Sequence, residues 1–114
     1  MHELSLLLAL ADQVQREAQR HGGGRVERVD LHIGSLAGVD PDALAFAFPL
    51  AMAGTPAAGA TLQITWLPAI ARCRACGWHQ DATHGVGPCP QCQHGGAELL
   101  QGRELHLHAL TLAP

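Results

Sequence analysis

Two periodicities in the distribution of apolar residues predict most of the secondary structure. Between residues 4 and 20, apolar side chains recur three and four positions apart, as on one face of an amphipathic helix. Residues 22–24 are three glycines, which end this helix and form a flexible turn. Residues 29–34 and 62–66 instead alternate apolar with polar side chains, the period of a half-buried strand. The first half of the chain is therefore expected to mix helices with strands.

A second helix is predicted between these two strands. Asp40 is a good N-cap residue, and Pro41 is well suited to the first helical position. The apolar pattern continues to Gly54, where the helix should stop. Pro49 has no N–H to donate within the helix, so it is expected to kink the helix or end it early.

A third strand follows near the C-terminus, and the order of elements then indicates the fold class. Residues 105–108 alternate leucine with histidine, and the phase changes at residues 109–110, where we expect a bulge. The prediction is an α+β fold, with two helices packed on a three-stranded sheet and a zinc-ribbon-like lobe inserted between the second and third strands. Residues 1–69 and 101–114 should form one domain, and residues 70–100 the other.

Composition and charge exclude several classes of protein. The chain has 47% hydrophobic residues, enough for a core, and a net charge of −3 from ten acidic residues against seven arginines, with no lysine. Nucleic-acid binding is not expected, because clustered positive charge is missing. Neither a signal peptide nor an apolar run long enough to span a membrane is apparent. We expect a cytoplasmic protein, in which cysteines stay reduced.

Four cysteines form the clearest candidate site. Cys73 and Cys76 make one C-x2-C pair, Cys89 and Cys92 make a second, and twelve residues separate the pairs. Two such pairs can place four thiolates at the corners of a tetrahedron, the geometry of a closed structural zinc site. The residues between the pairs are poor in apolar side chains, so the metal should supply folding energy. Unrelated core cysteines or two disulfides are the alternative.

Other residues near the cysteines refine this interpretation. Gly77 and Pro90 suit the tight turns of metal-binding knuckles, which rubredoxin-like iron sites share. His79 and His94 each follow a cysteine pair, so either could replace a thiolate or meet an incoming metal. The functions left open here are a zinc-ribbon protein-interaction module and a rubredoxin-like iron electron carrier.

The amino terminus offers a second candidate metal site, at Met1, His2 and Glu3. Met1 should be retained, because the aminopeptidase that removes initiator methionine requires a small second residue. Its amine, together with the amide nitrogen and imidazole of His2, can grip a square-planar nickel(II) or copper(II) ion. Glu3 would fill the fourth position, with Asp40 as a weaker candidate. An exposed, frayed terminus is the alternative.

These motifs together resemble the HypA/HybF family of hydrogenase maturation factors. The similarity follows the whole chain in order. It rests on Met1-His2-Glu3, the stretches 33–39 and 40–44, Phe46-x-Phe48, the two C-x2-C pairs, and Gly102-Arg103-Glu104-Leu105.

The resemblance implies a nickel metallochaperone and not an enzyme. By this resemblance His2, with Glu3 beside it, is the nickel ligand, and residues 1–69 and 101–114 form the nickel-binding domain. The resemblance also implies that the four cysteines bind a structural zinc ion, in a zinc-binding domain of residues 70–100. The partners it implies are the GTPase HypB and the large subunit of a nickel-iron hydrogenase. Whether the chain forms a homodimer is left open.

The chain departs from the common family pattern in Pro49, in its lack of lysine, and in two histidines of the last predicted strand. These histidines, His106 and His108, could share a sheet face with His32 and form an extra metal patch. Exposed strand histidines without a ligand are the favoured interpretation.

Overall fold

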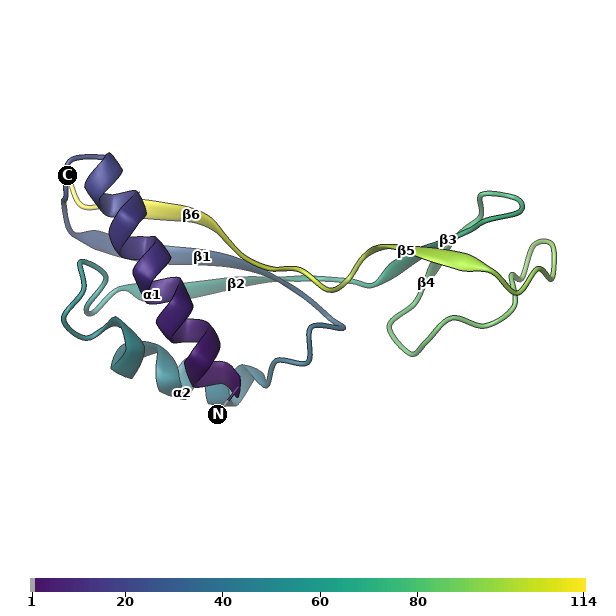
Figure 1. The fold of residues 1–114 in the computed structure, drawn as a ribbon, viewed down its shortest axis with the longest axis horizontal. Helices are drawn as coiled ribbons and strands as arrows, with labels where there is room; N and C mark the ends of the chain where they lie inside the picture. The colour runs from purple at the N-terminus through teal and green to yellow at the C-terminus, as the bar shows by residue number, and fades with distance from the viewer. Residues whose placement is uncertain (1) are drawn as a thin grey trace. The chain divides into compact units, whose positions relative to one another are not determined.

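The computed structural model describes residues 2–114, with only the backbone of His2 (Figure 1). The described chain contains two helices and six strands, which form two three-stranded sheets. In chain order the elements are α1 (His2–Arg20), β1 (Val26–Gly34), α2 (Pro41–Met52), β2 (Thr61–Leu67), β3 (Ile70–Cys73), β4 (His79–Asp81), β5 (Ala97–Gln101) and β6 (Leu105–Leu112). The predicted α+β class with a zinc-ribbon-like lobe is confirmed.

The chain folds as two compact units. The first, called here the helical unit, contains the chain up to Leu31 together with Val39–Ile64 and Leu107–Pro114. The second, the cysteine unit, contains His32–Gly38 and Thr65–His106. The functional domain boundaries expected at residues 69/70 and 100/101 stay a prediction.

Helix α1 buries the apolar face that the sequence indicates. Its buried side chains, spaced three and four apart, are Leu7, Leu10, Ala11, Val14 and Ala18. The helix ends in a Schellman motif: the N–H of Gly23 donates to the Ala18 carbonyl at 2.8 Å, and that of Gly22 to Gln19 at 3.3 Å. Gly22 and Gly23 have φ values of 99° and 77°, which glycine adopts without strain.

Helix α2 begins with the expected cap. The carboxylate of Asp40 accepts hydrogen bonds from the N–H groups of Asp42 at 3.0 Å and Ala43 at 3.4 Å. Pro49 lies inside the helix, which continues past it to Met52 and does not end at the proline. Pro49 and Ala45 are both exposed, so water can donate a hydrogen bond to the Ala45 carbonyl, which proline cannot.

Of the described helices, neither α1 nor α2 is long and apolar enough to span a bilayer.

The first sheet has the strand order β2-β1-β6 and contains the three strands that the sequence predicts. Strands β1 and β6 are antiparallel, since the Gly34 N–H donates to the Glu104 carbonyl at one end and the Ala113 N–H to Arg25 at the other, both at 2.8 Å. Strand β6 runs without interruption from Leu105 to Leu112. The bulge expected at residues 109–110 stays a prediction.

A second sheet, which the sequence did not indicate, frames the cysteine unit. Its order is β4-β3-β5, and β3 pairs antiparallel with both neighbours. Ala69, Ala71 and Ala82 are fully buried and form a small core, against which Leu36, Ala97 and Leu99 pack. Residues 77–88 contribute Ala82 to it, so most of this core comes from sequence outside the segment between the cysteine pairs.

Two glycines allow a close approach of the backbone within the cysteine unit. A Cβ atom at Gly34 would collide with the carbonyl group of Gly102 and lie 2.6 Å from the Arg103 nitrogen. Gly102 has a φ of 133°, and its carbonyl accepts from the Leu36 N–H at 2.7 Å. The family-like stretches around residues 34 and 102 therefore meet in space, and glycine is required at their contact.

Candidate metal centre

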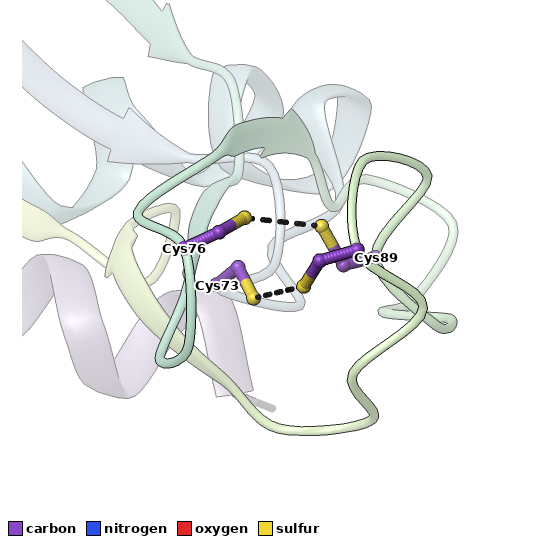
Figure 2. A group of neighbouring side chains, drawn as sticks. Cys73, Cys76 and Cys89 are labelled. Carbon is purple, nitrogen blue, oxygen red and sulfur yellow. Dashed lines mark hydrogen bonds between the residues drawn. The ribbon is translucent and has the colours of Figure 1, made fainter.

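The structure brings the four cysteines together although the two pairs are far apart in sequence. Sγ of Cys73 lies 3.6 Å from Sγ of Cys92, and Sγ of Cys76 lies 3.6 Å from Sγ of Cys89 (Figure 2). All four sulfur atoms lie within 4.8 Å of one another. Each contact joins one cysteine of the first pair to one of the second, so the cluster ties two distant segments together.

Each pair forms a turn whose backbone points toward sulfur. Sγ of Cys73 accepts from the Ala75 N–H at 3.4 Å, and Sγ of Cys89 accepts from the Gln91 N–H at 3.3 Å. In both pairs the first cysteine is buried and the second is exposed. Such amide donors favour the thiolate form, which is the form that binds metal.

The two turns close in the same way but with different residues. The Gly77 N–H donates to the Cys73 carbonyl at 2.9 Å, and the Gln93 N–H donates to the Cys89 carbonyl at 2.8 Å. Both residues adopt left-handed backbone, with φ of 81° at Gly77 and 67° at Gln93. The sequence signalled the first turn through its glycine, but glutamine gave no such signal for the second.

The cluster fits a tetrahedral metal ion. Four thiolates about 2.3 Å from a zinc ion would have sulfur atoms about 3.8 Å apart, close to the 3.6 Å of the two contacts. A set of four sulfur ligands suits zinc or iron and leaves no position for a substrate. Among the described residues, no other group of three or more cysteine, histidine or carboxylate side chains comes within ligating reach.

The pKa values of Cys73, Cys76 and Cys92 are shifted in opposite directions. Hydrogen bonding from the Cys76 backbone, aided by Ala75 and Cys92, outweighs burial and lowers the pKa of Cys73 to about 6. The Trp78 backbone lowers the pKa of Cys76, but desolvation of its sulfur atom within the cluster and the neighbouring thiols, Cys89 first, outweigh this effect and raise the pKa to about 12. The pKa of Cys92 is also raised, because desolvation of its sulfur atom and the hydrogen bond with Cys73 outweigh the hydrogen bond from the His94 backbone. A metal ion must therefore displace protons from Cys76 and Cys92.

The two histidines beside the cysteine pairs do not belong to the cluster. His79 is the first residue of β4, where it is exposed and pairs with Arg72 of β3. His94 turns back on its own backbone, with Nδ1 accepting from the Gly96 N–H at 3.0 Å.

At the amino terminus, the structure places part of the expected site. Met1 and the His2 side chain lie outside the described residues, but the His2 backbone forms the first residue of α1. Oε2 of Glu3 accepts from the Asp40 N–H at 3.2 Å. The two acidic residues named as candidates for the fourth nickel position are therefore adjacent, one at the start of α1 and the other capping α2.

Comparison with known proteins agrees with these features. A sequence model of the family described as "Hydrogenase/urease nickel incorporation, metallochaperone, hypA" matches residues 1–112. The hydrogenase maturation factor HypA of Chlorobium limicola is 41% identical over 112 residues, covering 98% of this chain and 97% of that protein. The factor named HybF from Klebsiella pneumoniae is 38% identical over 110 residues, covering 96% and 97% respectively.

Solved structures show the same fold. A solution structure of the nickel metallochaperone HypA from Helicobacter pylori superposes with a TM-score of 0.68 at 21% identity, over 96% of each chain. A second solution structure, described as HypA protein, gives a TM-score of 0.73 at 23% identity over 99% of this chain and 97% of the other.

Proposed function

The chain belongs to the HypA family of nickel metallochaperones for hydrogenase maturation, and from this membership we propose that it binds nickel at its amino terminus and delivers it to the large subunit of a nickel-iron hydrogenase. It acts as an accessory factor without catalysis of its own. A HypB-like GTPase assists the transfer, and both partners meet the protein in the cytoplasm.

The proposed nickel ligands are the Met1 amine, the amide nitrogen and imidazole of His2, and an atom of Glu3. The observation that carries this assignment is that α1 begins at His2. Amides in the first turn of a helix have no intrahelical carbonyl to bond, so the His2 amide can lose its proton to a metal without breaking the helix. Square-planar nitrogen ligation suits nickel(II).

Glu3 also connects this site to the second helix. Its carboxylate accepts from the backbone of Asp40, which in turn caps α2. We infer that this contact holds the start of α1 in place and keeps an oxygen ligand beside the proposed nickel position. Glutamine could accept the same hydrogen bond through its amide oxygen, so Glu3→Gln should preserve the geometry.

For the four cysteines we propose a structural zinc ion. The matched sulfur distances support it, as does the small alanine core, which buries little apolar surface. In this proposal residues 70–100 are the zinc-binding domain, and residues 1–69 with 101–114 are the nickel-binding domain. Purified protein should carry about one zinc per chain and be colourless, whereas a rubredoxin-like iron site would be coloured.

The nickel assignment is tested by titration with calorimetry on protein that retains zinc. An N-terminal extension without histidines converts the terminal amine to an amide, so tight nickel binding should be lost. His2→Ala should cost as much, because it removes the other end of the chelate, and Glu3→Gln should be milder. The matched control is the same extension at the C-terminus, which should leave nickel binding unchanged.

Equal nickel affinity in the N-terminally extended and untagged proteins would refute the terminal chelate. Zinc content, measured on every variant, separates this outcome from damage to the cysteine unit. Delivery is tested by mixing nickel-loaded protein with nickel-free hydrogenase large subunit, with and without the GTPase. Transfer should be lost in the His2→Ala protein.

A further inference from the structure

Two histidines of the cysteine unit face each other across neighbouring strands. The Gly34 N–H donates to the Glu104 carbonyl at 2.8 Å, which sets the register of β1 against β6 at this end. Two residues further along each antiparallel strand, His32 lies opposite His106. Their ring centroids are 5.5 Å apart, with the ring planes tilted by 47°.

The face on which this pair lies is accessible. Leu31 and Ile33, the chain neighbours of His32, are buried, so the alternation of a strand directs His32 to the opposite face. His32 is half-buried and His106 is exposed. One imidazole is thus held by its surroundings, while the other has room to turn toward an ion.

The separation suits two imidazoles that share one ion. A metal about 2.1 Å from a ring nitrogen lies roughly 3 Å from the centre of that ring, so two rings on one ion have centroids up to about 6 Å apart. The observed 5.5 Å falls within this limit. Directly opposite strand positions also keep the two β-carbons about 5 Å apart, which prevents the pair from separating.

We propose that His32 and His106 form an auxiliary site for a divalent transition-metal ion, with nickel(II) as the ion relevant to this chain. Imidazole is a good ligand for nickel, zinc and copper. Neither histidine lies in the stretches that carry the family resemblance, and neither belongs to the cysteine cluster or the amino terminus.

Two protein ligands determine how such a site behaves. Water completes the coordination shell, so the ion binds more weakly than at a closed cluster and exchanges with solvent. The second imidazole nevertheless adds affinity, because it is already held next to the first and its binding is intramolecular. The pair is suited to capturing and releasing nickel, not to retaining it.

The test uses the full zinc-loaded chain with the histidine-free N-terminal extension, which separates this site from the proposed terminal one. Nickel titration by calorimetry should show one weak site per chain, and nickel should raise the melting temperature. His32→Gln and His106→Gln should each lower the affinity of that site by at least about tenfold. The double variant should lose the weak site altogether, because no imidazole remains there to bind the ion.

His108→Gln is the matched control, because His108 lies on the same strand as His106 and is also exposed. It should leave the weak site unchanged. Absence of a weak site in the extended protein, its survival in His106→Gln, or an equal loss in His108→Gln would each overturn the proposal. If the His32→Gln variant unfolds, as judged by zinc content and circular dichroism, nickel titration of the His106→Gln variant tests the proposal by itself. A tight site that persists in the extended protein would instead refute the terminal chelate.

Discussion

Replacing Gly77 by alanine should weaken zinc binding through the backbone alone. Gly77 has a φ of 81°, in the left-handed region that residues with a Cβ avoid. Among the described residues no heavy atom lies within 4 Å of a Cβ built at this position, so crowding adds nothing. The substitution should therefore destabilise the folded, zinc-bound lobe by about 1–2 kcal/mol. Because zinc binding and folding of this lobe are coupled, the apparent zinc affinity should fall roughly 5- to 30-fold.

The second knuckle provides the reciprocal experiment. Gln93 occupies the equivalent position with a φ of 67°, so the natural protein already bears this backbone cost. Gln93→Gly should relieve it, although the greater freedom of glycine in the unfolded chain offsets part of the gain. We expect zinc binding up to about fivefold tighter, equivalent to about 1 kcal/mol.

The assay is competition for zinc with a chromophoric chelator at fixed pH. Gly87→Ala is the control, because Gly87 lies between the same cysteine pairs, has no left-handed backbone, and has open space around it among the described residues. Its zinc affinity should stay within about twofold of the natural protein, or ~0.5 kcal/mol. If Gly77→Ala bound zinc as tightly as the natural protein, or if Gly87→Ala lost as much zinc affinity as Gly77→Ala, the left-handed backbone at residue 77 would not be what affects zinc binding.

Three further predictions concern packing, capping and pH. Gly34→Ala should destabilise the protein by about 1–3 kcal/mol in chemical denaturation, because its Cβ would meet the Gly102 backbone; a loss below about 0.5 kcal/mol would contradict this. Asp40→Ala should cost about 1 kcal/mol in thermal unfolding through loss of the α2 cap, while Asp40→Asn should retain most of it. Zinc affinity should decrease as pH decreases, because the pKa of Cys76 is raised to about 12 and zinc must displace its proton near neutral pH.

The slope of zinc affinity against pH should change at the pKa of Cys73. The pKa of Cys73 is lowered to about 6, so this thiol is ionised in the metal-free fold above that pH and takes up a proton only below it. Its depressed pKa contributes stability above the unfolded value near 9, and this contribution is lost as pH falls through about 6. The logarithm of zinc affinity should therefore fall more steeply below about pH 6, by roughly one extra proton per zinc. A constant slope through this region would show that Cys73 is not the depressed thiol.

The first half of the fold was accessible from local sequence patterns. The apolar repeat of α1 and the alternation of β1 each describe one face of one element, and a neighbouring element covers that face. Asp40 was recognisable as a cap because its side chain bonds to amides only two and three residues away. The effect of Pro49 was harder to predict, because the free-energy cost of a proline within a helix depends on whether water can reach the carbonyl that it leaves without a hydrogen bond.

The second sheet shows where local patterns fail. Strands β3, β4 and β5 are short, and within them only Ala71 and Cys73 are buried. Alanine has no strong preference for strands, so these segments show no clear strand pattern. Their pairing depends on contacts such as Ala71 with Leu99, which only the folded chain brings together. Nothing in the spacing of apolar residues could have indicated them.

For the sites, the sequence by itself determined the chemistry: which side chains can bind a metal, and that two C-x2-C turns can each present a pair of thiolates. The tertiary structure decided which of these side chains meet. It joined Cys73 to Cys92 and Cys76 to Cys89, placed Glu3 against the backbone of Asp40, and set His32 opposite His106. Ligand type and short turns are properties of a few consecutive residues, whereas these contacts depend on the strand register and chain path that bring distant residues together.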